Sequence, residues 1–519
     1  MGTERLPGDL AEGSELDRIV DEVVSDARLT AAALRPEERD YLKEHALKKP
    51  LGVGQIWALG VGAVITGAYF GWNPGLGIAG PIGMLLASLF VCVLYLAWVL
   101  SLSELSVAMP FAGGPLAYGR RALRPWLGFV MGWSMFLESL FAMIGTAIAT
   151  GGYVYFILNL VLQNMVSGAP GELDKPLVTT LAALVTVGVF ALVQCLGARQ
   201  QARLMEWMTY GAIAGLVWFW VACIPAVRLE RIFTEPLLPN GWSGVLKAIP
   251  YAIWWLVIIE TVALAAEEAH EPHRTIPRGL LLAQLTLIAL VVLTWFFTAA
   301  AGDDYRKTGD LEYPLPWVYA EVWPGRAHLP HLLAFAVVAI CGMIASYNGM
   351  LYAVSRQSFS LGRAGYLPRF LGRVHARRRT PDASILVWSL AAAGFVIWSY
   401  FNSRAVEVAV LTCNLAALIW YVLAMVCLYV LRVKEPDMPR PYKVPFYPFL
   451  PALVLVMSLF AAGVYAWEQN TVVLWVTAIM YAAGLAYYFG FARTRLATAA
   501  PEELAARRSN VPPHGGSDG

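Results

Sequence analysis

The chain has 519 residues, of which 58% are hydrophobic and only 14% are charged. Because soluble domains usually carry about 25% charged residues, this composition excludes an ordinary soluble protein and indicates an integral membrane protein. The formal net charge of +2 says nothing about partners until the charges are placed along the chain.

The six cysteines fall in or beside apolar runs and form no CxxC pair. We interpret them as small core residues rather than as a disulfide framework or a zinc site. The seven histidines lie in tails, loops or segment ends, without HxxxH spacing. Since the sequence offers neither a metal cluster nor a nucleophile constellation, we predict no enzyme activity, no metal site and no cofactor.

Residues 1–50 are polar and rich in acids, so they do not read as a signal peptide and are predicted to form a soluble tail. Within SELDRIVDEVVSDARL, five apolar residues recur at helical spacing and predict a short amphipathic helix. A helix packed on the cytoplasmic face is the favoured interpretation, and a regulatory role is the alternative. The five residues are Leu16, Ile19, Val20, Val23 and Val24.

Twelve apolar segments follow, each long enough to cross a bilayer. The third is long enough to tilt or to project beyond the bilayer. The sequence therefore predicts an all-α integral membrane protein with twelve transmembrane helices. The approximate bounds are 52–77, 79–106, 126–162, 176–196, 205–225, 247–268, 277–301, 331–358, 383–401, 405–432, 446–467 and 471–491.

Lysine and arginine residues indicate the orientation of these segments, because cytoplasmic loops carry an excess of them. With the N-terminus inside, the inner loops hold 18 such residues and the outer loops hold 8. This asymmetry predicts that both termini are cytoplasmic, and it explains the arginine-rich loop after segment eight without a nucleic-acid partner. That loop and the end of its helix contain Arg356, Arg363, Arg369, Arg373, Arg377, Arg378 and Arg379.

The first segment contains GVGAVITGAYFGWNPGLG, in which four glycines and a proline make the helix easy to break. Unpaired backbone is tolerated at membrane depth only where it lines a cavity or is buried in protein. We therefore predict a broken helix and a binding site near the middle of the bilayer. The residues concerned are Gly60, Gly62, Gly67, Gly71 and Pro74.

Segment three carries Glu138 inside the apolar run, where a charge costs on the order of 3 kcal/mol. Ser134, Glu138, Gly145 and Thr146 share one helical face, which should point into the bundle. We interpret Glu138 as part of a substrate or ion path. The alternative is a buried glutamate whose hydrogen bonds keep the helices in register.

Segment six, IPYAIWWLVIIETVALAAEEAHEP, starts after a proline as the first segment does, and carries Glu260 near its middle. The first and sixth segments therefore fit corresponding members of two five-helix repeats of opposite topology. Gly60–Gly71 and Ile258–Val262 would face each other if the two breaks lie at one depth. A desolvated carboxyl group at Glu260 could exchange protons, or it could cap amides that the break frees.

Glu267 falls roughly on the same face as Glu260 if the helix between them is regular, so a proton path along that face is one interpretation. Glu267 and Glu268 also lie near the cytoplasmic end, where they could instead pair with loop arginines or cap helix ends. Glu104, at the cytoplasmic end of segment two, receives the same structural interpretation.

The two repeats define the expected domain organisation. Residues 51–432 are predicted to form a ten-helix transport core, with repeats at about 51–225 and 247–432. Residues 433–491 would add helices eleven and twelve, and residues 492–519 would form a cytoplasmic tail.

Four stretches resemble the amino acid–polyamine–organocation transporter superfamily, whose members typically carry a Glu-Leu, a proline, an AGG, a tyrosine and a Gly-Trp at similar spacings. The first is VLSLSELSVAMPFAGGPLAYGRRALRPWLGFVMGWSMFLE (Val99–Glu138). The others are ALAAEEAHEPHRTIPRG (Ala263–Gly279), SYNGMLYAVSRQSFSLGRAGYLPRFL (Ser346–Leu371) and RPYKVPFYPFLP (Arg440–Pro451). The resemblance implies a leucine-transporter-like fold with an inverted five-plus-five core and two added helices.

Within that superfamily, ITGAYFGWNPGL is most similar to the bacterial ethanolamine permease branch, in which a Gly-x-Tyr-Phe-Gly-Trp-Asn run is usual. The resemblance implies a transporter of a bacterial inner membrane that imports ethanolamine or a related small amine by alternating access. It also implies a role in proton sensing or gating for Glu260.

The expected site suits a small ammonium ion, because aromatic faces and a carboxylate attract such a cation. Aromatic residues follow the first break at Tyr69, Phe70 and Trp72 and precede the second at Trp254 and Trp255. The hydroxyl group of ethanolamine would need a polar partner, and Thr66, Ser346 and Asn348 are candidates. We predict substrate binding by Ile65, Thr66, Gly67, Ala68, Tyr69, Phe70, Glu138, Trp255, Ile258, Ile259 and Ser346, and proton coupling or gating by Glu260 and Glu267.

Amides freed near Ile65–Ala68 would open the second half of the broken helix and attract an anion. An amino acid would place its carboxylate there, whereas ethanolamine has no carboxylate. The alternatives are therefore an amino acid or polyamine permease of the same superfamily, or a non-transporting nutrient sensor on this fold. Proton coupling is favoured over sodium coupling, because the core segments supply carboxylates and few clustered hydroxyl groups.

Overall fold

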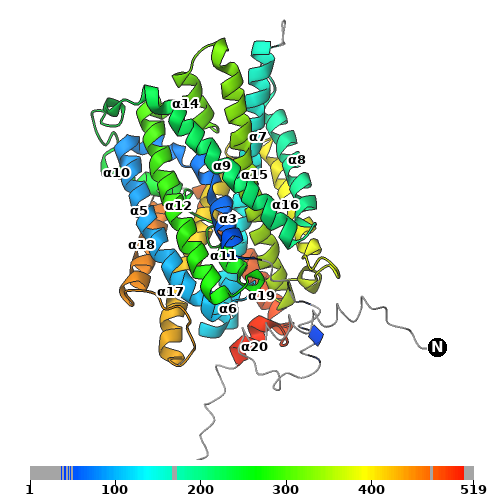
Figure 1. Cartoon of the computed structure of the whole chain (residues 1–519). Coiled ribbons are helices and arrows are strands. Elements are labelled where there is room, and N and C mark those ends of the chain that lie inside the picture. The colour runs from blue at the N-terminus through cyan, green and yellow to red at the C-terminus, as the bar shows by residue number, and fades with distance from the viewer. Residues whose placement is uncertain are drawn as a thin grey trace, which may run out of the picture.

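The computed structural model describes residues 51–165, 172–467 and 471–507, together with Glu37, Asp40, Tyr41, His45 and Leu47. The amphipathic helix predicted at residues 16–24 lies outside these residues. Within them the fold is helical, and the only β-type pairing is a single bridge between Leu51 and Ala269. The predicted all-α class is confirmed (Figure 1).

Ten helices in the described residues are long and apolar enough to cross a membrane, and they correspond to predicted segments two to five and seven to twelve. The third segment is α7, whose 41 residues span about 60 Å and so exceed the ~30 Å hydrocarbon core. The ten are α5 (Asn73–Ala108), α7 (Pro125–Met165), α8 (Lys175–Gln194), α9 (Ala198–Cys223), α12 (Pro272–Ala301), α15 (Leu329–Arg363), α16 (Asp382–Ser399), α17 (Ala405–Lys434), α18 (Phe449–Trp467) and α19 (Thr471–Gly490).

Short helices connect these spans. The α-helical ones are α6 (Gly114–Ala122), α13 (Tyr305–Gly309), α14 (Pro314–Val322) and α20 (Pro501–Arg507). The 3₁₀ helices are η2 (Ile224–Ala226), η3 (Leu229–Arg231), η4 (Ala266–Glu268), η5 (Arg326–His328), η6 (Arg369–Gly372) and η7 (Ala492–Thr494).

The first segment is broken, as the sequence predicts. It runs through α3 (Val53–Val64) and α4 (Thr66–Tyr69), passes through extended backbone at Phe70, and resumes as the first turns of α5. Gly80 has φ 72°, a value that favours glycine, and the resulting kink divides α5. Residues 73–79 thus complete segment one, and segment two begins after the kink.

The sixth segment is also broken, and its break is longer than that of the first. It comprises α10 (Gly241–Ile253), turns over residues 254–260, α11 (Thr261–Leu264) and then η4. Ile258 adopts φ 77°, which is strained for a β-branched residue and marks a site where the surrounding packing fixes the backbone. α10 begins six residues before the predicted segment, so Pro250 lies inside this helix.

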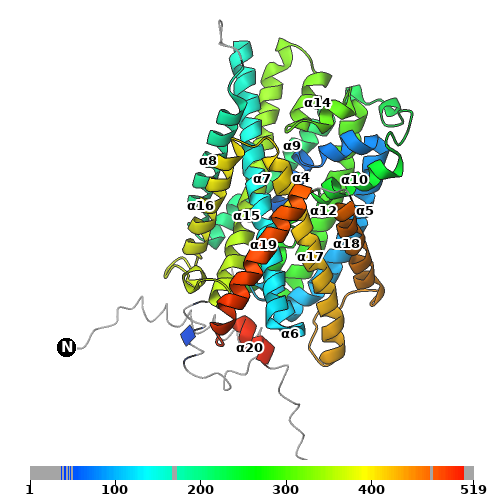
Figure 2. The same ribbon diagram turned by 180° about the vertical axis from the view of Figure 1, so that it is seen from behind.

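The broken segments lie in the centre of the bundle. α3 packs against α9, α12 and α15, while α7 packs along α15 and α17. Figures 1 and 2 show α6 and α20 at one end of the molecule and α14 near the other. We call the end with α6, η6 and α20 the arginine-rich end, because the arginine-rich loop after α15 lies there.

Candidate functional site

The two helix breaks touch each other at Gly67. A Cβ atom built on Gly67 would lie 2.5 Å from the carbonyl oxygen of Trp254 and 3.1 Å from the Cα of Trp255. A side chain at this position would therefore collide with the backbone of the sixth segment. The first segment approaches the sixth again at Gly60, whose Cβ would lie 3.1 Å from Val262. The two predicted breaks thus form one buried region.

This close approach predicts that Gly67→Ala lowers the free energy of unfolding by about 1–3 kcal/mol, the usual cost of overpacking, and also reduces transport. Thermal unfolding of the purified protein and uptake into proteoliposomes measure the two effects. Gly188→Ala in α8 is the matched control, because no atom lies within 4 Å of its added Cβ. Equal stability and uptake for the two variants would contradict the proposed packing.

Protein acceptors already bind most of the amides that the sequence predicted to be freed at the first break. The amide of Ile65 donates to Val61 O (2.8 Å), that of Thr66 to Ser346 Oγ (2.9 Å), and that of Ala68 to Ile65 O (3.0 Å). The Ser346 hydroxyl in turn donates to Gly62 O at 2.7 Å. Ser346 therefore bridges the two sides of the break, and three of the four amides are engaged.

Glu138 and Glu260 meet in the buried centre of the bundle. Both carboxyl groups are fully buried, and Trp420 Nε1 donates to Glu138 Oε2 at 2.6 Å. The hydroxyl of Tyr421 donates to Glu260 Oε1. The remaining oxygens, Glu138 Oε1 and Glu260 Oε2, have no hydrogen-bond partner among the described residues, and the two carboxyl groups lie close enough to interact electrostatically. Two carboxylates so close together repel each other unless one is protonated or a cation joins them.

No lysine, arginine or histidine of the described residues forms an ion pair with either carboxyl group; the ion pairs lie elsewhere. Burying two unpaired negative charges together would be very costly. Glu138 and Glu260 therefore need a proton or a ligand cation to compensate their charge.

Four aromatic residues that the sequence analysis missed enclose this acid pair. Tyr95 and Trp98 come from α5, and Trp420 and Tyr421 from α17. The Trp98 ring lies 4.0 Å from that of Tyr421 and 4.8 Å from that of Trp420, measured between centroids. Two polar-tipped aromatic residues in the middle of a membrane span, rather than at its ends, are the sequence signal that could have identified Trp420 and Tyr421.

The predicted aromatic residues form a second group at the breaks themselves. Trp72 stacks on Trp255 with centroids 4.4 Å apart, and Phe70 packs edge-on against Trp254 at 5.6 Å. Tyr69 instead turns toward α9, where its hydroxyl donates to Ala212 O at 2.6 Å. The predicted site residues other than Glu267 are buried in this region or next to it, namely Ile65, Thr66, Gly67, Ala68, Tyr69, Phe70, Glu138, Trp255, Ile258, Ile259, Glu260 and Ser346.

Asn348 does not reach the breaks. Its side-chain oxygen and its backbone carbonyl both accept from Gln194 Nε2, at 2.9 and 2.7 Å. Asn348 therefore ties α15 to α8, and among the predicted hydroxyl partners Thr66 and Ser346 remain at the site.

Glu267 and Glu268 form buried ion pairs at the arginine-rich end. Arg363 binds both oxygens of Glu267 at 2.8 and 2.9 Å, and Ala112 N donates to the same carboxylate. Arg356 binds Glu268 at 2.9 Å, with Tyr352 Oη donating to it at 2.8 Å. These contacts match the pairing alternative for the two acids. They fasten the end of segment six to α15.

The C-terminal helix α20 extends this network. Glu502 accepts from Arg363 Nη2 and from Ser360 Oγ, each at 2.6 Å, and is fully buried. Glu503 accepts from Arg120 and from Tyr366 at 2.9 and 2.8 Å. Burial raises the pKa of the Tyr366 phenol well above its ordinary value, so its hydroxyl stays a donor. Arg363 thus holds segment six and α20 at once.

A model of the amino acid permease family matches residues 54–493. Branched-chain amino acid permease BcaP of Bacillus subtilis is 26% identical over 455 residues, which cover 87% of this chain and 94% of that protein. The methylthioribose transporter of the same organism is 26% identical over 466 residues, with coverages of 87% and 95%. L-asparagine permease of Streptomyces coelicolor is 26% identical over 470 residues, with coverages of 86% and 91%. All three names describe transport rather than catalysis.

Proposed function

We propose that this chain, which belongs to the amino acid permease family, imports ethanolamine or a related small amine by alternating access, with protons as the coupling ion. As a family member the chain is a multi-pass membrane transporter and not an enzyme.

The acid pair of Glu138 and Glu260 is the observation that carries the substrate proposal. An ammonium group entering between these side chains would neutralise one carboxylate, and the surrounding rings of Trp98, Trp420 and Tyr421 would add cation–π attraction. The second carboxyl group can keep a proton in the same step. One amine and one proton together then leave the buried pair without net charge.

The amides at the first break favour an amine over an amino acid. Because Val61, Ile65 and Ser346 already accept from three of them, a substrate carboxylate would have to displace internal hydrogen bonds. Ethanolamine has no carboxylate and needs only a partner for its hydroxyl group, for which the Thr66 hydroxyl is the candidate, because Ser346 Oγ already bonds to Thr66 N and Gly62 O. An amino acid substrate remains the second candidate, because two of the relatives above are named amino acid permeases.

The asymmetry of basic loops supports a cytoplasmic position for the arginine-rich end. The substrate would then enter from the opposite end. The ion pairs that join Arg356 and Arg363 to segment six would close the inner exit in the conformation described here. Import requires these pairs to separate while Gly67 and its contacts at the breaks act as the pivot.

A competition experiment tests the substrate. Uptake of radiolabelled ethanolamine into proteoliposomes is measured with excess unlabelled amines or amino acids. We expect ethanolamine and other small hydroxyl-bearing amines to compete, and leucine and asparagine to leave uptake unchanged. Competition by leucine or asparagine as strong as that by ethanolamine would overturn the amine proposal and favour the amino acid alternative.

A further inference from the structure

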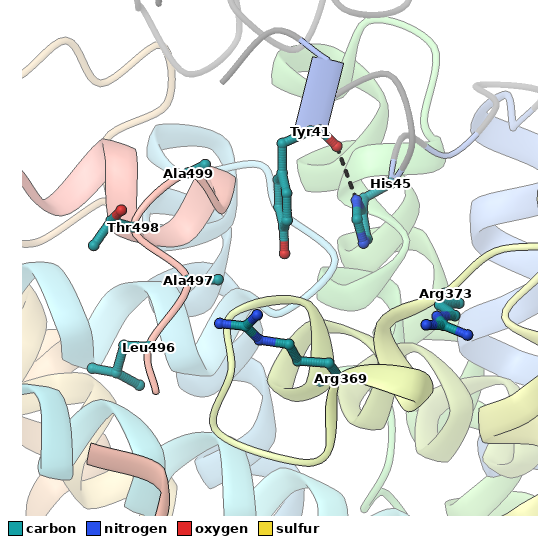
Figure 3. A pocket seen from close by; sticks show the side chains of 9 residues that line it. Tyr41, His45, Arg369, Arg373, Leu496, Ala497, Thr498 and Ala499 are labelled. Atoms are coloured by element: carbon teal, nitrogen blue, oxygen red, sulfur yellow. Dashed lines mark hydrogen bonds between the residues drawn. The ribbon is translucent and has the colours of Figure 1, made fainter. Parts of the chain in front are cut away.

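A second cavity, distinct from the site at the helix breaks, opens at the arginine-rich end. Its volume is about 380 Å³, within the range of small-molecule sites. Three stretches far apart in the sequence line it, and Figure 3 shows their side chains. They are Tyr41 and His45, the end of α15 and the stretch after it with Gly362, Arg369 and Arg373, and residues 496–499.

Among the described residues, the charged side chains that line this cavity are basic. Arg369 and Arg373 are exposed, and no acidic residue of the described chain lines the cavity. The Arg373 side chain has no hydrogen-bond or ion-pair partner among the described residues, while Arg369 makes one long contact of 3.5 Å with Arg495 O. The acids of nearby α20 are already bound to Arg363 and Arg120. A guanidinium group suits phosphate oxygens, because it offers paired N–H donors and a fixed positive charge.

Two aromatic rings, those of Tyr41 and His45, also line the cavity. The rings of Tyr41 and His45 stack with centroids 4.1 Å apart and planes inclined by 19°. In Figure 3 the two rings lie above the Arg369 side chain, and Arg373 lies to the right of them. A flat ring on a ligand can pack against such a surface while its phosphate reaches an arginine.

From this combination we infer that the cavity binds an anionic, phosphate-bearing ligand, with a nucleotide as the form that uses both the arginines and the rings. The inference uses the proposed cytoplasmic position of this end only to name the compartment that supplies the ligand. It is independent of the transported substrate.

The position of this cavity next to Arg363 would allow a bound ligand to regulate transport. Tyr41 Oη donates to the backbone carbonyl of Arg363, whose side chain holds Glu267 and Glu502. A ligand that bridges Tyr41, Arg369 and residues 496–499 would brace these segments around Arg363. Binding would therefore stabilise the closed arrangement of this end and slow transport.

Calorimetric titration of the purified full-length protein in phosphatidylcholine nanodiscs tests the inference, with ADP and inorganic phosphate as probes. We expect ADP to bind, and Arg369→Ala and Arg373→Ala each to weaken binding about tenfold or more, the loss expected for a charged hydrogen bond. Arg377→Ala, an exposed arginine of the same loop outside the cavity, should bind ADP as the wild type does. Tyr41→Leu should weaken ADP but not inorganic phosphate.

A lipid headgroup could supply the same phosphate, so the titration is repeated in phosphatidylglycerol nanodiscs. Lipid is the source of the phosphate if phosphatidylglycerol abolishes ADP binding to the wild type and also raises its unfolding temperature. The Arg369→Ala, Arg373→Ala double variant should then show no such rise. The inference is wrong if neither ADP, phosphate nor phosphatidylglycerol acts on the wild type, or if the arginine variants match it. Ethanolamine uptake by the variants is measured separately, so a failed transport proposal would not be confused with a failed binding site.

Discussion

Replacing Glu138 with glutamine is expected to abolish concentrative uptake and leave at most equilibration of substrate. Glutamine keeps the size of the side chain and an oxygen to accept from Trp420, but it can neither exchange a proton nor carry the negative charge that attracts the ammonium group of the substrate. Glu260→Gln should have the same effect for the same reason. Uptake of labelled substrate into proteoliposomes, with an imposed pH gradient, measures both variants.

Glu230→Gln is the matched control, because Glu230 is an exposed acid with no side-chain partner among the described residues. It should accumulate substrate as the wild type does. The pH dependence separates a chemical role from a structural one. Wild-type accumulation should depend on the gradient, whereas residual uptake by Glu138→Gln should not. Gradient-driven accumulation by either pair variant would remove that residue from the coupling mechanism.

Replacing Arg363 with methionine is expected to destabilise the protein by about 3–5 kcal/mol, the usual cost of breaking a buried ion pair by removing one partner. The guanidinium group is 1% exposed and binds Glu267 and Glu502 together. Its loss leaves two carboxylates buried without their cation. The unfolding temperature of the purified variant measures the effect.

Two further variants test whether charge rather than packing is responsible. Arg377→Met changes an exposed arginine of the same loop and should unfold like the wild type. Adding Glu267→Gln and Glu502→Gln to Arg363→Met should recover much of the lost stability, because no buried charge then lacks a partner. If Arg363→Met is as stable as Arg377→Met, the ion pairs of Arg363 with Glu267 and Glu502 do not stabilise the arginine-rich end.

The parts of the fold that depend on local chemistry could be predicted from the sequence. Hydrophobic length identified all twelve segments, and the glycines around Gly67 located the first break. Carboxyl groups are so unfavourable in hydrocarbon that Glu138 and Glu260 stood out in their segments, and the structure brings them together. The distribution of lysine and arginine among the loops predicts that both termini are cytoplasmic, and this orientation stays a prediction.

The parts that depend on long-range contacts could not be predicted. The mid-span position of Trp420 and Tyr421 is unusual, but it does not reveal that Trp420 contacts Glu138 of α7 and Tyr421 contacts Glu260 of segment six. Ser360 and Glu502 are 142 residues apart in sequence, so the docking of α20 left no local pattern. The sixth break is longer than the first although its centre has no glycine, because tertiary packing holds Ile258 in its strained turn.

The central claim is that a small amine and a proton move together through the site of Glu138 and Glu260. Proteoliposomes loaded with a pH-sensitive dye and given an inside-alkaline gradient test it most directly, with protein-free liposomes correcting for diffusion of the neutral amine. The account predicts that external ethanolamine accumulates and that the lumen acidifies faster than in liposomes with Glu138→Gln. Accumulation of leucine or asparagine in place of ethanolamine, or ethanolamine uptake without proton entry, would contradict it.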